Sequence, residues 1–207
     1  MRRTVAAAVV VVLVLGTLGG VASIARRGVS ARDEPTMVEK VVARGMRRLG
    51  IPRTARNAKN PVPFTPEALA DARAHFADHC AVCHANDGSG TTTIGRNLYP
   101  KAPDMRLADT QQLTDGELYS IIQNGIRLTG MPAWGKAGDE HDEDSWKLVH
   151  FIRHLKDLTP EELEEMKALN PKSPHEIEEE KAEEEFLRGG AERPGTPLQP
   201  GSRPDHD

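Results

Sequence analysis

The stretch Cys80-Ala81-Val82-Cys83-His84 decides how the rest of this sequence is interpreted. Two cysteines separated by two residues, with a histidine directly after the second, are typical of a covalent c-type haem site. Thiols one helical turn apart can each form a thioether bond with a vinyl group of the same porphyrin. The motif therefore predicts one covalent haem c, attached through Cys80 and Cys83, with His84 as an axial ligand of the iron.

Two other chemistries use a pair of cysteines at this spacing, and the sequence argues against both. A redox dithiol does not need the histidine. A structural zinc site needs two further ligands at finger-like spacing, whereas Cys80 and Cys83 are the only cysteines among the 207 residues.

Charge divides the sequence into three parts. The net charge is +9 for residues 1–60, −4 for residues 61–156 and −9 for residues 157–207. Because the basic part includes an apolar segment, we expect a membrane with anionic lipid as its partner. Aromatic residues do not interleave with a basic stripe, and we therefore expect no nucleic-acid partner.

An uncharged run of 22 residues, from Thr4 to Ala25, follows two arginines at the N-terminus. A membrane-spanning helix needs about 20 apolar residues, whereas a signal-peptide core has about 7–15. Small residues around Ser23 also fit a signal-cleavage site. We predict a transmembrane anchor in residues 1–32, with a signal peptide as the alternative.

The side of the membrane follows from the haem motif, since basic residues flank both ends of the apolar run. Covalent haem attachment takes place outside the cytoplasmic membrane. We therefore expect the haem domain on the periplasmic or outer face, or soluble in the periplasm if the run is cleaved.

Residues 33–64 are predicted to connect the apolar run to the haem domain. Apolar residues from Met37 to Leu49 recur at helical spacing, and basic residues fill the other positions. This pattern predicts a basic amphipathic helix, either on the membrane surface or packed on a partner. Asn60-Pro61-Val62-Pro63 is then expected to form a stiff linker.

Three helices are predicted in residues 65–156. Thr65 as N-cap and Pro66 at the first position begin a helix that runs into the haem motif. Thr114 and Glu117 form a capping box for a second helix. Asp144 can cap a third, whose apolar face from Trp146 to Leu155 should cross the Phe76 face of the first.

The segment Leu128–Gly135 is rich in glycine and proline and contains Met131. Because this segment lacks helical periodicity, packing in a core explains Met131 poorly. A thioether is a soft, neutral iron ligand, and opposite a histidine it raises the reduction potential. We predict Met131 as the second axial ligand, with Met105 as the competitor.

Further candidate pocket residues lie in the loop after the motif. A haem-ligating imidazole normally has its other nitrogen held by a second group such as a backbone carbonyl, and Pro100 or Pro103 could supply one here. The other candidates are Arg96, Tyr99 and Lys101 for the haem propionates, each of which could equally be an ordinary surface residue, and Trp134 beside Met131.

Residues 65–156 resemble a class I cytochrome c domain. The resemblance rests on the haem motif, Ala102-Pro103-Asp104-Met105, the capped middle helix, Gly130-Met131-Pro132-Ala133-Trp134 and the closing helix. It implies an all-α cytochrome c fold of about three to four helices around one haem. It also implies iron ligated by His84 and Met131, and electron transfer rather than substrate turnover. The match is closest to short bacterial members and leaves out residues 1–64 and 157–207.

The expected function is that of a single-electron carrier in a respiratory or periplasmic chain, with redox proteins as partners and no small-molecule substrate. One alternative is the cytochrome subunit of a membrane dehydrogenase or haem-copper oxidase. Another is a haem-based redox or gas sensor, in which the sixth ligand is labile.

Residues 157–207 are predicted to form an acidic tail, first helical and then disordered. Thr159 starts a short helix, Ser173 to Leu187 is strongly acidic, and Ala191 to Asp207 is rich in proline and glycine. The tail could dock a basic redox partner by electrostatic steering, or it could simply keep the protein soluble.

Overall fold

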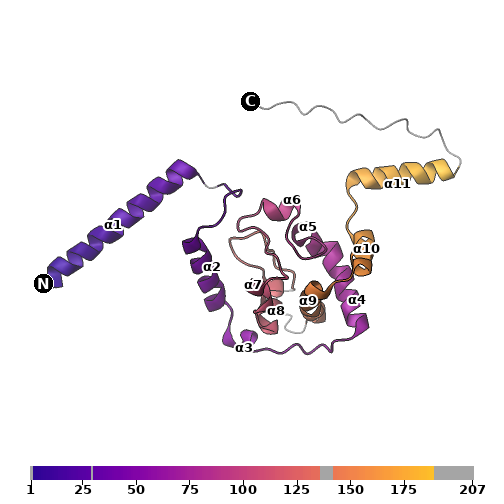
Figure 1. The fold of residues 1–207 in the computed structure, drawn as a ribbon, viewed down its shortest axis with the longest axis horizontal. Helices are drawn as coiled ribbons and strands as arrows, with labels where there is room; N and C mark the ends of the chain where they lie inside the picture. The colour runs from indigo at the N-terminus through magenta and orange to yellow at the C-terminus, as the bar shows by residue number, and fades with distance from the viewer. Residues whose placement is uncertain (1, 29, 136–141, 189–207) are drawn as a thin grey trace, which may run out of the picture. The chain divides into compact units, whose positions relative to one another are not determined.

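The computed structural model describes residues 2–28, 30–135 and 142–188, and over these ranges it is all-helical, without a strand (Figure 1). This confirms the predicted fold class. The chain divides into two units, residues 1–169 and 170–207. The predicted disorder of residues 191–207 lies outside the described residues.

Helix α1, Arg2–Arg27, contains the apolar run. Its segment Arg2–Ser23 has 22 residues, a mean hydropathy of 2.6 and no buried residues in its most apolar window. By length and composition this helix can cross a membrane, and a signal sequence near the N-terminus would have the same properties.

Helix α2, Met37–Gly50, is capped by Thr36, whose side chain forms a capping box with Glu39. The short helix α3, Arg53–Arg56, comes next. The segment after α3 packs against the core through Ala58 and Val62, and the Asn60 side chain donates to the carbonyl of Trp146 (2.9 Å). The predicted linker therefore lies on the domain.

One continuous helical run leads into the haem motif. Helix α4, Pro66–His75, is capped by Thr65 as predicted. A π-helical turn, η1, covers Phe76–Cys80, and helix α5, Ala81–His84, completes the run. The run ends at Ala85, whose φ of 59° is incompatible with further helix.

The other helices of the first unit complete the domain around this run. They are α6 (Thr93–Arg96), α7 (Ala108–Gln111), α8 (Asp115–Asn124), α9 (Glu143–His154), the 3₁₀ turn η2 (Leu155–Asp157) and α10 (Pro160–Leu169). Thr114 caps α8 with the predicted box. Helix α9 is capped by Asp142, where the sequence favours Asp144.

The core lies where α4 and η1 cross α9, as the sequence predicts. The rings of Phe76 and Phe151 are both buried, with centroids 5.0 Å apart. Leu118 and Ile122 of α8 extend this core, and the rings of Tyr119 and Trp146 stack between α8 and α9 at 4.0 Å. Burial of these apolar faces is the main source of the domain's stability.

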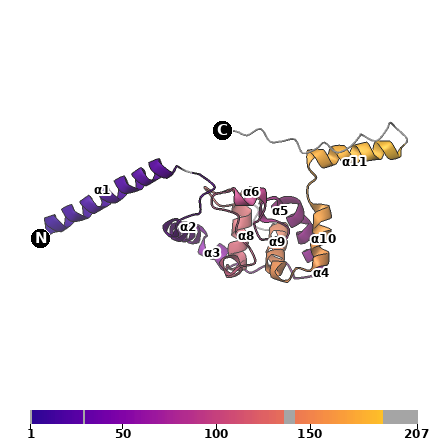
Figure 2. The ribbon, with the colours of Figure 1, turned by 45° about the horizontal axis from the view of Figure 1, so that its top comes forward.

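Helix α10 packs beside α4 and η1, where both views show it (Figure 1 and Figure 2). Its Met166 is fully buried in the core. Arg73 of α4 pairs with Glu162 (2.9 Å) and with Glu165 (2.5 Å). The predicted acidic tail thus begins with a helix that belongs to the packed domain.

The second unit contains helix α11, Pro174–Leu187. Ser173 caps it with a box to Glu176, and none of its residues is buried. Its acidic side chains are therefore exposed, as expected for an acidic tail.

Candidate haem site

The two motif cysteines lie on successive helical turns at the end of the run. Cys80 is the last residue of η1 and Cys83 lies in α5. Both side chains are half-buried, and no disulfide joins them. Burial raises the pKa of the Cys80 thiol to about 12 and also raises the pKa of Cys83. Both thiols are therefore protonated at neutral pH, so neither acts as a reactive thiolate in the protein alone.

His84, the last residue of α5, has a neutral imidazole. Burial lowers its pKa, and the backbone of Pro103 acts in the opposite direction with a smaller effect. Its Nδ1 is buried and has no hydrogen-bond partner among the described residues. A backbone carbonyl that accepts from one nitrogen of an imidazole leaves the lone pair of the other nitrogen free for a metal.

Close contacts hold the Pro103 loop against the loop after His84. Gly90 donates its N–H to the His84 carbonyl (2.8 Å), and Met105 donates to the Gly88 carbonyl (2.8 Å). A Cβ on Gly90 would lie 2.4 Å from the Ala102 carbonyl oxygen, so this close approach requires glycine.

Arg106 adds an ionic clamp between the same two loops. Its guanidinium lies 2.9 Å from Asp87 in one loop and 2.7 Å from Asp104 in the other. The clamp stabilises the backbone that places the Pro103 carbonyl beside His84. Sequence reasoning missed Arg106, and the available signal was a charged residue amid aspartates in an otherwise glycine-rich region.

The Met131 segment forms a tight loop between α8 and α9. The Met131 carbonyl accepts from the Ile126 N–H (3.1 Å), and the Met131 N–H donates to the Thr129 hydroxyl (3.1 Å). A Cβ on Gly130 would lie 2.6 Å from the Leu98 side chain, so this loop abuts the loop after the motif. Met131 is half-buried.

Met105 has a different environment. It is 7% exposed and belongs to the apolar core. Its carbonyl accepts from the Gln111 side chain (2.7 Å), which also donates to the Ile152 carbonyl (2.8 Å). Core packing therefore explains Met105, whereas it does not explain Met131.

The remaining pocket candidates have protein partners. Trp134 is 38% exposed, and its ring meets that of His79 edge-on at 5.4 Å. Tyr99 bonds to Glu39 of α2, which raises the pKa of the phenol. Arg96 is exposed and donates to the Thr91 carbonyl (2.6 Å), and Lys101 pairs with Glu34. Their contact with a haem stays a prediction.

The donor set fits a haem better than a separate metal ion. A c-type haem uses two thiols, a neutral imidazole and a thioether. Cys80, Cys83, His84 and Met131 can supply these groups. Among the described residues, no group of three or more His, Cys, Asp or Glu side chains could hold a metal ion.

A family model described as cytochrome C oxidase, cbb3-type, subunit III matches residues 67–152. Residues 67–152 form a cytochrome c domain. The matched part runs from α4 into α9 and covers less than half of the chain. No curated protein matches the chain. As a cytochrome c domain, this part binds haem and transfers electrons.

Proposed function

We propose that the chain is a membrane-anchored carrier of single electrons with one covalent haem c. Cys80 and Cys83 would form the thioethers, and His84 and Met131 would be the axial ligands. The observation that carries the proposal is the place of His84, which is half-buried, has a lowered pKa and lies beside the Pro103 backbone, at the end of the helical run that bears both cysteines.

Each protein group has a distinct role in this proposal. A bound haem supplies an iron that gains and loses one electron. The Pro103 backbone would orient the His84 ring and increase its basicity. Met131 would contribute a neutral sulfur that favours the reduced iron. If the protein supplied both His84 and Met131 to the iron, no ligand position would be left for a substrate.

The setting of the domain is also part of the proposal. Helix α1 would stay attached as an anchor, and the cytochrome c domain would lie on the periplasmic or outer face. Support comes from the length and apolar composition of Arg2–Ser23. Redox proteins of the same electron-transfer chain would be its partners.

A second candidate role is that of an electron-transfer subunit within an oxidase complex. It is favoured by the description of the matching family, which names a subunit of a cbb3-type cytochrome oxidase. Purification from membranes without strong detergent distinguishes the two roles. A large catalytic subunit that accompanies the chain would support the second role, and a chain that purifies alone would support the first.

The ligand assignment is tested by replacing Met131 or Met105 with leucine, which removes the sulfur with little change in volume. Met131→Leu should abolish the weak ferric absorption band of a methionine–iron bond and lower the reduction potential, while Met105→Leu should preserve both. The opposite pattern would refute the assignment. Mass spectrometry of the denatured protein should show one haem still attached, and a Cys80→Ser Cys83→Ser variant should lose it.

A further inference from the structure

Helix α2 leaves an apolar surface exposed. Six large apolar side chains of this helix are between 52% and 88% exposed, namely Met37, Val38, Val41, Val42, Met46 and Leu49. None of its residues is buried. A continuous exposed apolar surface of this kind indicates an interaction site.

The polar flank of α2 carries its contacts with the rest of the unit. Glu39 bonds to Tyr99, and Arg44 pairs with Asp109 of α7. At 100° per residue, these two side chains lie at the two edges of the polar half of the helix, with Ala43 between them, and the apolar residues occupy the other half. The apolar surface thus points away from the domain contacts.

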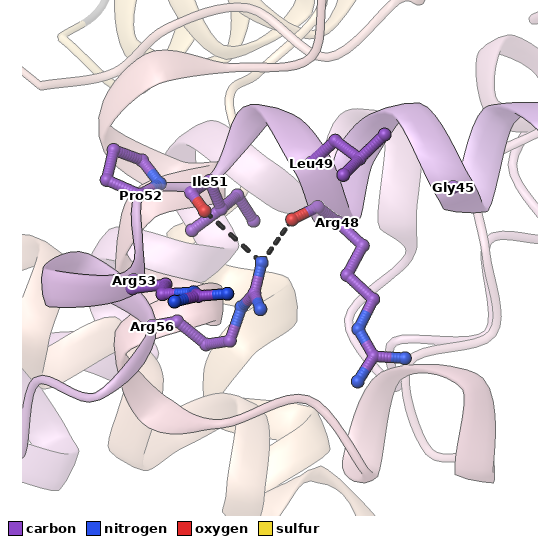
Figure 3. A pocket seen from close by; sticks show the side chains of 7 residues that line it. All are labelled: Gly45, Arg48, Leu49, Ile51, Pro52, Arg53 and Arg56. Carbon is purple, nitrogen blue, oxygen red and sulfur yellow. Dashed lines mark hydrogen bonds between the residues drawn. The ribbon is translucent and has the colours of Figure 1, made fainter.

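A basic cavity adjoins the end of this surface (Figure 3). It has a volume of about 460 Å³ and is lined by Gly45, Arg48, Leu49, Ile51, Pro52, Arg53 and Arg56. The Arg56 guanidinium donates to the carbonyls of Ile51 (3.3 Å) and Arg48, and it also pairs with Glu117. Within the described ranges, no acidic side chain pairs with Arg48 or Arg53, and both are exposed.

Charge and chain length point to an anionic bilayer as the occupant of this surface. Residues 37–56 contain six basic side chains and one acidic one. Only residues 28–36 separate α1 from α2, and nine residues span at most about 32 Å. If α1 is in the membrane, α2 therefore remains close to the headgroups.

We propose that α2 lies in the interface of an anionic membrane, with Val38, Val42 and Leu49 facing the acyl chains and Arg48 and Arg53 binding lipid phosphates. Apolar burial and attraction to anionic lipid are the two contributions that hold such helices at an interface. Through Glu39 and Arg44, this helix would set the orientation of the cytochrome c domain on the membrane. The proposal rests on the anchoring by α1 proposed above.

The test is amide hydrogen exchange of residues 37–50 in the full haem-loaded chain, reconstituted into vesicles of phosphatidylcholine alone or with added phosphatidylglycerol. We expect exchange of α2 to be at least about tenfold slower in the anionic vesicles. Val42→Asp should remove this protection. Ala43→Asp, which adds the same charge to the polar flank at the next exposed position, should retain it.

The arginines are tested by titration with phosphatidylglycerol. Arg48→Gln Arg53→Gln should weaken the apparent affinity by roughly 30-fold at low salt. Equal exchange in neutral and anionic vesicles, or equal effects of Val42→Asp and Ala43→Asp, would overturn the proposal. Protection that appears in detergent without lipid and depends on protein concentration would indicate a second copy instead and would also overturn it.

Failure of the anchoring is measured separately. Extraction of neutral vesicles at alkaline pH reports whether α1 holds the chain in the bilayer, whatever α2 does. A chain that is extracted refutes anchoring by α1. Amide hydrogen exchange of α2 in anionic vesicles does not depend on the extraction step. It therefore still supports or overturns the interfacial proposal by itself.

Discussion

Replacement of Met166 by alanine tests whether α10 belongs to the cytochrome c domain. Met166 is fully buried in the core shared by α4, η1 and α9. Truncating a buried methionine to alanine costs about 2–5 kcal/mol of unfolding free energy. The other contacts of α10 are made by side chains at its surface, so the helix can detach from the domain instead of leaving a cavity. We therefore expect the loss of unfolding free energy to lie at the lower end of this range, about 2–3 kcal/mol.

The assay is guanidinium unfolding of the haem-loaded protein, monitored by the Soret band and by far-ultraviolet circular dichroism. Leu169→Ala, at an exposed position of the same helix, is the matched control and should cost less than about 0.5 kcal/mol. Limited proteolysis should cut α10 faster in Met166→Ala alone. A cost below about 1 kcal/mol for Met166→Ala would refute the packing of α10 as part of the domain.

Two further predictions concern charged contacts. Arg106→Gln should lower the unfolding free energy by about 1 kcal/mol and shift the imidazole resonances of His84 in NMR spectra, because the loop that carries Pro103 loses its clamp; unchanged resonances would contradict the role of the clamp. Burial raises the pKa of Glu162, but hydrogen bonds led by the Thr159 N–H outweigh it and lower the pKa below its ordinary 4.5. Since the lowered pKa stabilises the folded state above pH 4.5, we expect α10 to loosen as pH falls below that value. Glu162→Gln should remove this pH dependence of proteolysis, and an unchanged acid transition would contradict it.

Local signals predicted much of the domain. The side chain of Thr65 caps α4 and that of Thr114 caps α8, as expected, because capping depends on residues within one turn. The crossing of α4 and α9 at Phe76 follows from their apolar faces. The cysteine motif indicated haem chemistry because its spacing is set by the porphyrin itself.

Contacts between residues far apart in sequence determine the features that the sequence predicted wrongly or did not indicate. Helix α9 is capped by Asp142 rather than by Asp144, and the Gln123 side chain of α8 also donates to Asp142 (2.7 Å). The contacts of two histidines of α9 have no local signal either: His150 lies 2.8 Å from the Val62 carbonyl, and His154 lies 3.0 Å from Glu162.

The packing of α10 on the domain also could not be predicted from local sequence patterns. In an acidic helix with little amphipathic pattern, one buried methionine gives a weak signal, and its partners lie far away in sequence. The four-part division of the chain, at residues 32, 64 and 156, stays a prediction, as do the axial ligand Met131 and the propionate contacts.

The π turn at Phe76–Cys80 changes the direction in which side chains point between the two ends of one helical run. The Ala81 N–H reaches back five residues to the Phe76 carbonyl, so the turn contains one residue more than an α-helical turn. Each extra residue rotates the downstream part of the helix by about 100°. The direction of Cys83 and His84 is thus set independently of the face that Phe76 buries against α9. Removing one residue from this turn would keep the helix and the motif intact, yet it would turn Cys83 and His84 away from their present neighbours.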